Sequence, residues 1–66
     1  MANRTAYELL QEVRKHNTGA RELFVVARLS LKTGLDLNAL RPDDRDEAKA
    51  KKLQNAVREV CPNIPL

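Results

Sequence analysis

A narrow apolar stripe defines the first element of the chain, over residues 5–16. Its apolar positions recur at i, i+3, i+4 and i+7, which is the spacing of one face of an α-helix. They are Ala6, Leu9, Leu10 and Val13. Thr5 and Glu8 have the spacing of a capping box, in which two side chains accept hydrogen bonds from backbone amides at a helix start. The pattern predicts a helix that runs from about Thr5 to His16.

The residues that follow this helix favour a change of direction. Asn17 and Gly19 both tolerate the left-handed conformation in which many helices end. Thr18 has a side chain suited to cap the next helix. We therefore expect a short turn and a second element from about residue 19.

The second element, residues 19–33, sorts its side chains by face when it is wound as a helix. At 100° per residue its three cations lie within about 40° of one another. They are Arg21, Arg28 and Lys32. The apolar residues occupy a wide opposite arc: Leu23, Phe24, Val26, Ala27, Leu29 and Leu31. Gly34 is suited to stop this helix, with Leu35 folding back on its last turn in a Schellman-type ending.

A β-hairpin is the alternative for part of the same stretch. Leucines alternate with polar residues on both sides of the Thr33-Gly34 step, and such alternation around a two-residue loop is typical of paired strands. The strands would lie near residues 28–32 and 35–39. The sequence thus favours an all-α, three-helix domain and leaves an α-β-hairpin-α domain as the alternative.

The third element, residues 43–61, has the clearest helical pattern. Its apolar face consists of Ala50, Leu53, Ala56, Val57, Val60 and Cys61. Pro42 is suited to a first helical position, and the acidic residues after it complement the positive end of the helix dipole. Pro62 ends the helix. In the extended tail, Ile64 and Leu66 are candidates to dock on the core.

The length of 66 residues limits the chain to one domain, residues 1–66. A chain this short buries only about 60% of the surface that its unfolded form exposes, so its stability is marginal. Cys61 is the only cysteine, which excludes a disulfide within the chain. Self-association or a partner is therefore the expected source of additional buried area.

The sequence predicts neither a membrane span nor an export signal. No apolar run approaches the ~20 residues of a membrane span, and the first residues lack the apolar core of a signal peptide. We expect a soluble, cytoplasmic protein that does not engage a membrane.

The side chains that could serve catalysis all have simpler structural roles. His16 is placed to interact with the carbonyl end of the first helix, and Asp43 and Asp44 are placed at the start of the third. Cys61 belongs to an apolar face and has no cysteine or histidine partner at the spacing of a zinc site. We therefore expect no enzymatic activity, no small-molecule substrate, no cofactor and no metal.

The net charge of +3 arises in the first two thirds of the chain. Residues 1–42 hold seven Lys or Arg and four acids, whereas residues 43–66 hold five of each sign. Such a basic surface suits nucleic acid or an acidic protein. A helix-turn-helix is a weak match, because Pro42 would interrupt the recognition helix. The basic face also lacks the interleaved aromatic residues that stack on bases.

The wide apolar arc of the second element is the main candidate interaction surface. The narrow faces of the other two helices leave part of it exposed, unless the leucines of residues 35–40 and the C-terminal tail complete the core. The leading hypothesis is a small regulatory or inhibitory protein that binds a larger protein, as a monomer or a homodimer. The alternative is a dimeric DNA-binding transcriptional regulator that uses the basic helix face. The candidate partner-binding residues are Arg21, Val25, Arg28, Leu29 and Lys32.

Overall fold

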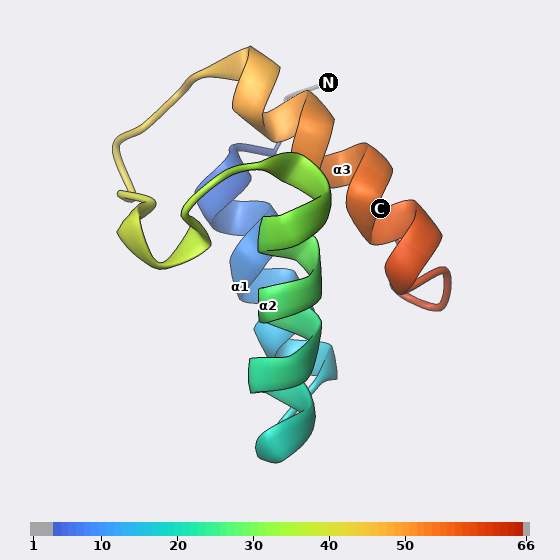
Figure 1. The fold of residues 1–66 in the computed structure, drawn as a ribbon. Coiled ribbons are helices and arrows are strands. Elements are labelled where there is room, and N and C mark those ends of the chain that lie inside the picture. The colour runs from blue at the N-terminus through green and yellow to red at the C-terminus, as the bar shows by residue number, and fades with distance from the viewer. Residues whose placement is uncertain (1–3, 66) are drawn as a thin grey trace.

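The computed structural model describes residues 4–65, and all regular structure in this range is helical. The elements in order are the helices α1 (Ala6–His16), α2 (Ala20–Thr33) and α3 (Glu47–Val60), with one 3-10 turn, η1 (Leu37–Ala39), between α2 and α3 (Figure 1). The predicted all-α fold is confirmed. The β-hairpin alternative is wrong, because residues 28–33 continue α2 and residues 35–39 contain no strand.

α1 begins at the predicted capping box. The Thr5 amide donates to Glu8 Oε1 over 2.9 Å, and the Glu8 amide donates to Thr5 Oγ1 over 3.2 Å. At the other end, Asn17 Nδ2 donates to the Val13 carbonyl over 2.9 Å, and the Asn17 side chain is buried. Both ends of α1 are therefore closed by side chains close to them in the sequence.

The turn between α1 and α2 differs in detail from the prediction. Gly19 has the positive φ of 69° that glycine permits, whereas Asn17 is extended with a φ of −134°. Gly19 is also the N-cap of α2, and no side chain caps this helix start. The expected cap by Thr18 is therefore wrong, because α2 begins directly after the glycine.

Gly34 ends α2, as predicted, in the left-handed conformation with a φ of 71°. Its amide donates to the Ser30 carbonyl over 2.8 Å, which is the single bond of the simpler αL ending rather than the paired bonds of a Schellman motif. The Leu35 amide instead donates to Thr33 Oγ1 over 3.2 Å. Leu35 does pack against the core after this turn.

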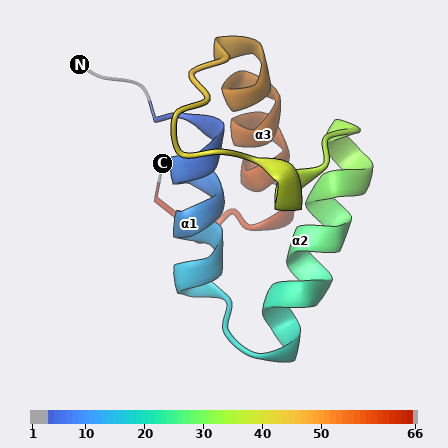
Figure 2. The same ribbon diagram turned by 90° about the vertical axis from the view of Figure 1, so that its left-hand side faces the viewer.

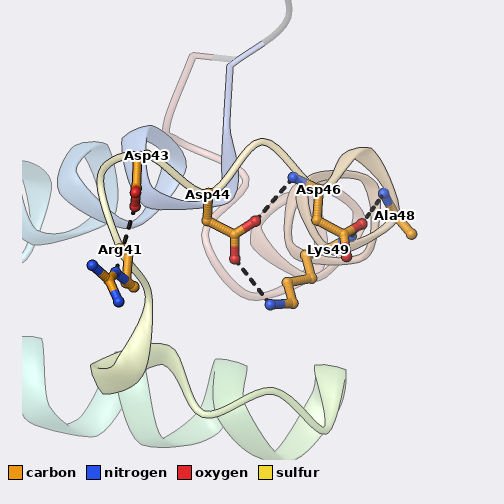
Figure 3. A network of polar contacts seen from close by, with 6 residues as sticks. All are labelled: Arg41, Asp43, Asp44, Asp46, Ala48 and Lys49. Atoms are coloured by element: carbon orange, nitrogen blue, oxygen red, sulfur yellow. Dashed lines mark hydrogen bonds and ion pairs between the residues drawn. The ribbon is translucent and has the colours of Figure 1, made fainter.

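α3 begins four residues later than predicted. Pro42 follows Arg41 in a turn closed by a 3.1 Å bond from the Asp44 amide to the Arg41 carbonyl, and proline favours this second position of a β-turn. Asp46 is the actual N-cap, since its carboxylate accepts from the Ala48 amide over 2.9 Å (Figure 3). The proline and the first acids therefore build a turn that leads into α3.

The core lies where α3 packs against both α1 and α2 (Figures 1 and 2). Its buried apolar members are Ala6, Leu9, Leu10, Val13, Val26, Leu29, Leu37, Leu53, Ala56, Val57 and Ile64. Leu37 comes from η1 and Ile64 from the tail, so both segments help to close the core, which the sequence had left open. Leu66 lies outside the described residues.

Candidate interaction surface

The outer face of α2 carries apolar side chains that nothing in residues 4–65 covers. Leu23, Phe24 and Leu31 are 75%, 76% and 86% exposed. Together with two exposed alanines they recur at i, i+3, i+4, i+7 and i+11, the spacing of one helix face. We call this set the outer stripe: Ala20, Leu23, Phe24, Ala27 and Leu31. At 1.5 Å per residue it extends for about 16 Å along the helix.

α2 thus has two apolar faces, and only one of them enters the core. Val26 and Leu29 are buried, and Val25 is half-buried against them. At 100° per residue the outer stripe occupies about 100° of arc on the side roughly opposite Leu29. A contiguous apolar patch left in water is a feature that interaction surfaces share.

A basic edge borders the outer stripe on the side that faces α3. Arg21 and Arg28 are both exposed there, and neither takes part in an ion pair with the residues that the structure describes. They line an open groove of about 560 Å³ between α2 and α3. Its other lining residues are Ala20, Phe24, Val25, Glu59 and Val60. The groove therefore joins the stripe to two free guanidinium groups.

Lys32 is engaged differently from the two arginines. Its Nζ donates to Glu59 Oε2, which ties the end of α2 to α3. This hydrogen bond, with the charge of Lys32, holds the pKa of Glu59 below its usual range. Since Lys32 balances the only acid that lines the groove, Arg21 and Arg28 define its net charge.

The other edge of the stripe is polar and electrically balanced. Arg14 Nε lies 3.3 Å from Glu22 Oε1, an ion pair without the geometry of a hydrogen bond. Arg14 also donates to Asn38 Oδ1 over 3.4 Å. With Ser30, these residues line a smaller hollow of about 280 Å³ beside Leu23. The positive edge of the stripe is therefore on one side only.

The structure brings together three of the five residues expected to bind a partner, namely Arg21, Val25 and Arg28, in one groove. Lys32 lies on the same side of α2, where it pairs with Glu59. Leu29 requires a correction: it is 0% exposed and belongs to the core, so it offers no surface to a partner.

The three large exposed residues of the outer stripe, Leu23, Phe24 and Leu31, are not in the expected set. They had been placed in a single wide apolar arc together with Leu29. The recurrence of apolar residues from Ala20 to Leu31 at helix spacing would have separated a second face. It could not have shown which face is buried, because that depends on where α1 and α3 pack.

The residues considered for catalysis have structural contacts. His16 Nε2 lies 3.5 Å from Glu12 Oε2. Asp43 lies 3.5 Å from Arg41 Nε, and Asp44 accepts from Lys49 Nζ over 2.9 Å (Figure 3). Cys61 packs half-buried against the core, and burial raises the pKa of its thiol.

Within residues 4–65, no group of three or more His, Cys, Asp or Glu is placed to hold a metal ion. No helix in this range is long and apolar enough to cross a membrane. Comparisons with protein-family models, curated proteins and solved structures gave no match. The exposed outer stripe with its basic edge is the candidate functional surface among the described residues.

Proposed function

We propose that this protein is a small non-enzymatic binding protein that attaches to a larger protein through the outer stripe of α2. The observation that carries the proposal is the exposure of Leu23, Phe24 and Leu31 on one face of one helix. Covering a leucine or phenylalanine side chain contributes about 1.5–3 kcal/mol for each residue. Three such side chains contribute about 4.5–9 kcal/mol, from which the entropy cost of association is subtracted.

The spacing of the stripe suits one recognised mode of binding. An amphipathic helix can lay its apolar face into a groove or against a helix of a partner, with anchors at i, i+3, i+4 and i+7. The stripe has this spacing when counted from Ala20, with Leu23, Phe24 and Ala27 at i+3, i+4 and i+7, and Leu31 extends it by one turn. The small side chains of Ala20 and Ala27 allow a partner backbone to approach closely between the larger anchors.

The proposed role is regulatory or inhibitory, and the kind of surface supports it. Apolar anchors and two arginines can hold a partner and occupy its surface, but they offer no group positioned to make or break a bond. Binding of this kind acts by blocking a site on the partner or by favouring one of its conformations.

The nucleic-acid alternative has less support. Of the three cations on the basic face, Lys32 is engaged with Glu59, which leaves Arg21 and Arg28 as free contacts for phosphate. Two phosphate contacts give a weak, salt-sensitive complex. DNA bound to the basic edge would also leave the neighbouring apolar side chains in water.

Affinity capture with matched baits tests the proposal. The full-length tagged protein and its Leu23→Gln/Leu31→Gln variant are incubated with native lysate of the cells that make the protein, with and without nuclease. Both substitutions keep the net charge and replace exposed side chains, so the fold is expected to persist, which circular dichroism checks. The control bait is Lys51→Gln/Arg58→Gln, which changes two exposed residues on α3.

We expect the wild-type and control baits to capture one protein partner in stoichiometric amount, and this capture should persist after nuclease treatment. The Leu23→Gln/Leu31→Gln bait should not capture this partner. Equal capture by all three baits would show that the outer stripe is not the binding surface. Loss of all captured protein after nuclease treatment would favour the DNA-binding alternative.

A further inference from the structure

The charge beside the outer stripe restricts the chemistry of the partner. Arg21 and Arg28 lie seven residues apart on α2, so they follow the same edge of the stripe two turns from each other. Both are exposed, and the one acid in their groove, Glu59, is held by Lys32. Any surface that covers the stripe must therefore meet two uncompensated positive charges along one edge.

A second copy of the chain does not satisfy these charges. If two α2 helices pack antiparallel about a two-fold axis, each edge meets its own equivalent, so Arg21 and Arg28 face the arginines of the other copy. If the helices pack parallel, the basic edge of one copy meets the polar edge of the other copy. On that polar edge Ser30 and Asn38 are uncharged, and Glu22 already pairs with Arg14. Neither arrangement supplies an unpaired carboxylate to the basic edge.

We infer that the partner presents an amphipathic helix whose apolar stripe is bordered on one side by acidic residues. This inference rests on the proposed function and specifies the partner for the same surface. Apolar side chains of the partner cover Leu23, Phe24 and Leu31, while its carboxylates reach Arg21 and Arg28. Arginine suits this contact because its guanidinium binds a carboxylate through two parallel hydrogen bonds.

The groove between α2 and α3 provides space for the acidic edge. Phe24 and Val25 contribute apolar walls from α2, and Val60 contributes one from α3. A glutamate of the partner can lay its methylene groups on these walls while its carboxylate meets Arg21 or Arg28. Displacement of water from the groove increases the Coulomb attraction between the two charges and also costs desolvation free energy. The two parallel hydrogen bonds of an arginine–carboxylate pair offset that cost.

Two synthetic peptides of about 18 residues, long enough to form a helix in water, test the inference. Both carry leucines at i, i+3, i+4 and i+7, and they differ only in one flanking edge, which is glutamate in one and lysine in the other. Binding to the full-length protein is measured by fluorescence anisotropy at fixed ionic strength. The protein variants are Arg21→Glu/Arg28→Glu and, as a matched control at the same i, i+7 spacing on α3, Lys51→Glu/Arg58→Glu.

We expect the glutamate-edged peptide to bind the wild-type protein about tenfold or more tightly than the lysine-edged peptide. Arg21→Glu/Arg28→Glu should reverse this preference, whereas Lys51→Glu/Arg58→Glu should preserve it. Leu23→Gln/Leu31→Gln should weaken the binding of both peptides.

The outcomes separate this inference from the proposed function. Equal affinity for both peptides, lost in Leu23→Gln/Leu31→Gln, would overturn the acidic partner and leave the binding surface intact. Binding that is insensitive to Leu23→Gln/Leu31→Gln, or no binding of either peptide, would overturn both. Dimerisation that sedimentation detects and that requires Leu31 would overturn the inference, because a second copy would then cover the stripe. Binding of duplex DNA that requires only Arg21 and Arg28 would overturn it in favour of nucleic acid.

Discussion

Leu29 and Leu31, two residues apart on α2, lie at opposite extremes of exposure: 0% for Leu29 and 86% for Leu31. In a helix, two positions correspond to a rotation of about 200°, so the two side chains point to opposite sides. One leucine belongs to the core beneath α3, and the other belongs to the outer stripe. The same residue type therefore serves folding at one position and is available for binding at the other.

Replacing each of these leucines by alanine should change the stability of the fold to different extents. Leu29→Ala should lower the free energy of unfolding by about 2–5 kcal/mol, because it leaves a cavity in the core. Leu31→Ala should change it by less than about 0.5 kcal/mol. Urea unfolding followed by circular dichroism measures both. Similar losses in the two variants would mean that the outer face of α2 is part of the fold.

The two glycines with positive φ should respond differently to asparagine. Gly34 lies in the left-handed region, with φ and ψ of 71° and 12°, which asparagine tolerates. Gly19 has a φ of 69° with a ψ of −143°, a combination largely restricted to glycine. A Cβ atom would meet no neighbour within 4 Å at either position, so the backbone conformation alone decides the effect.

Gly19→Asn should therefore cost about 1–3 kcal/mol of stability, whereas Gly34→Asn should cost less than about 1 kcal/mol. Thermal unfolding of both variants at one pH provides the comparison. A larger loss for Gly34→Asn would contradict the assigned conformations of the two turns.

The start of α3 can be located by two aspartate substitutions. Asp46→Ala should lower stability by about 0.5–2 kcal/mol, because the Ala48 and Lys49 amides lose the carboxylate that caps them. Asp43→Ala removes only an exposed ion pair with Arg41, and should change stability by less than about 0.5 kcal/mol. Chemical unfolding curves of the two variants decide between a helix that starts at Glu47 and one that starts near Pro42.

Acid should weaken the fold through three carboxylates. Hydrogen bonds are the main cause that lowers the pKa of Glu8, Asp44 and Glu59. The main donor is the Thr5 amide for Glu8, the Lys49 side chain for Asp44 and the Lys32 side chain for Glu59. A carboxylate whose pKa is lower in the folded state than in the unfolded state stabilises the fold when the pH is above the pKa of the unfolded state. This stabilisation is lost as the pH falls through the pKa of the folded state. Stability should therefore decline below about pH 4, the range of unperturbed carboxylates.

A carboxyl NMR titration combined with unfolding at several pH values tests this expectation. Glu8→Gln should flatten part of the acid dependence, because glutamine does not titrate in this range. Glu47 is an exposed acid on the first turn of α3 with no side-chain hydrogen bond among those that the structure shows, so Glu47→Gln is the control. An equal effect of the two substitutions would contradict the specific role of the capping box.

The sequence predicted part of the candidate surface for a clear reason. Arg21 and Arg28 share a helix face by periodicity alone, and Val25 lies one turn from each of them, so their proximity follows from the helix. Leu29 was misassigned because periodicity shows that a residue is apolar and on a given face, but not whether another helix covers that face. The groove itself needs α3 and could not be predicted from α2 alone.

The sequence by itself determined the features that depend on near neighbours along the chain. The capping box at Thr5 and the glycine stop at Gly34 act within a few residues, and apolar spacing distinguishes helices over a few turns. Only the tertiary structure decided that Leu29 rather than Leu31 is buried, and that Leu37 and Ile64 complete the core. The physical reason is that α2 is apolar on two faces, so the choice of the buried face depends on packing against α1 and α3, which are distant in the sequence.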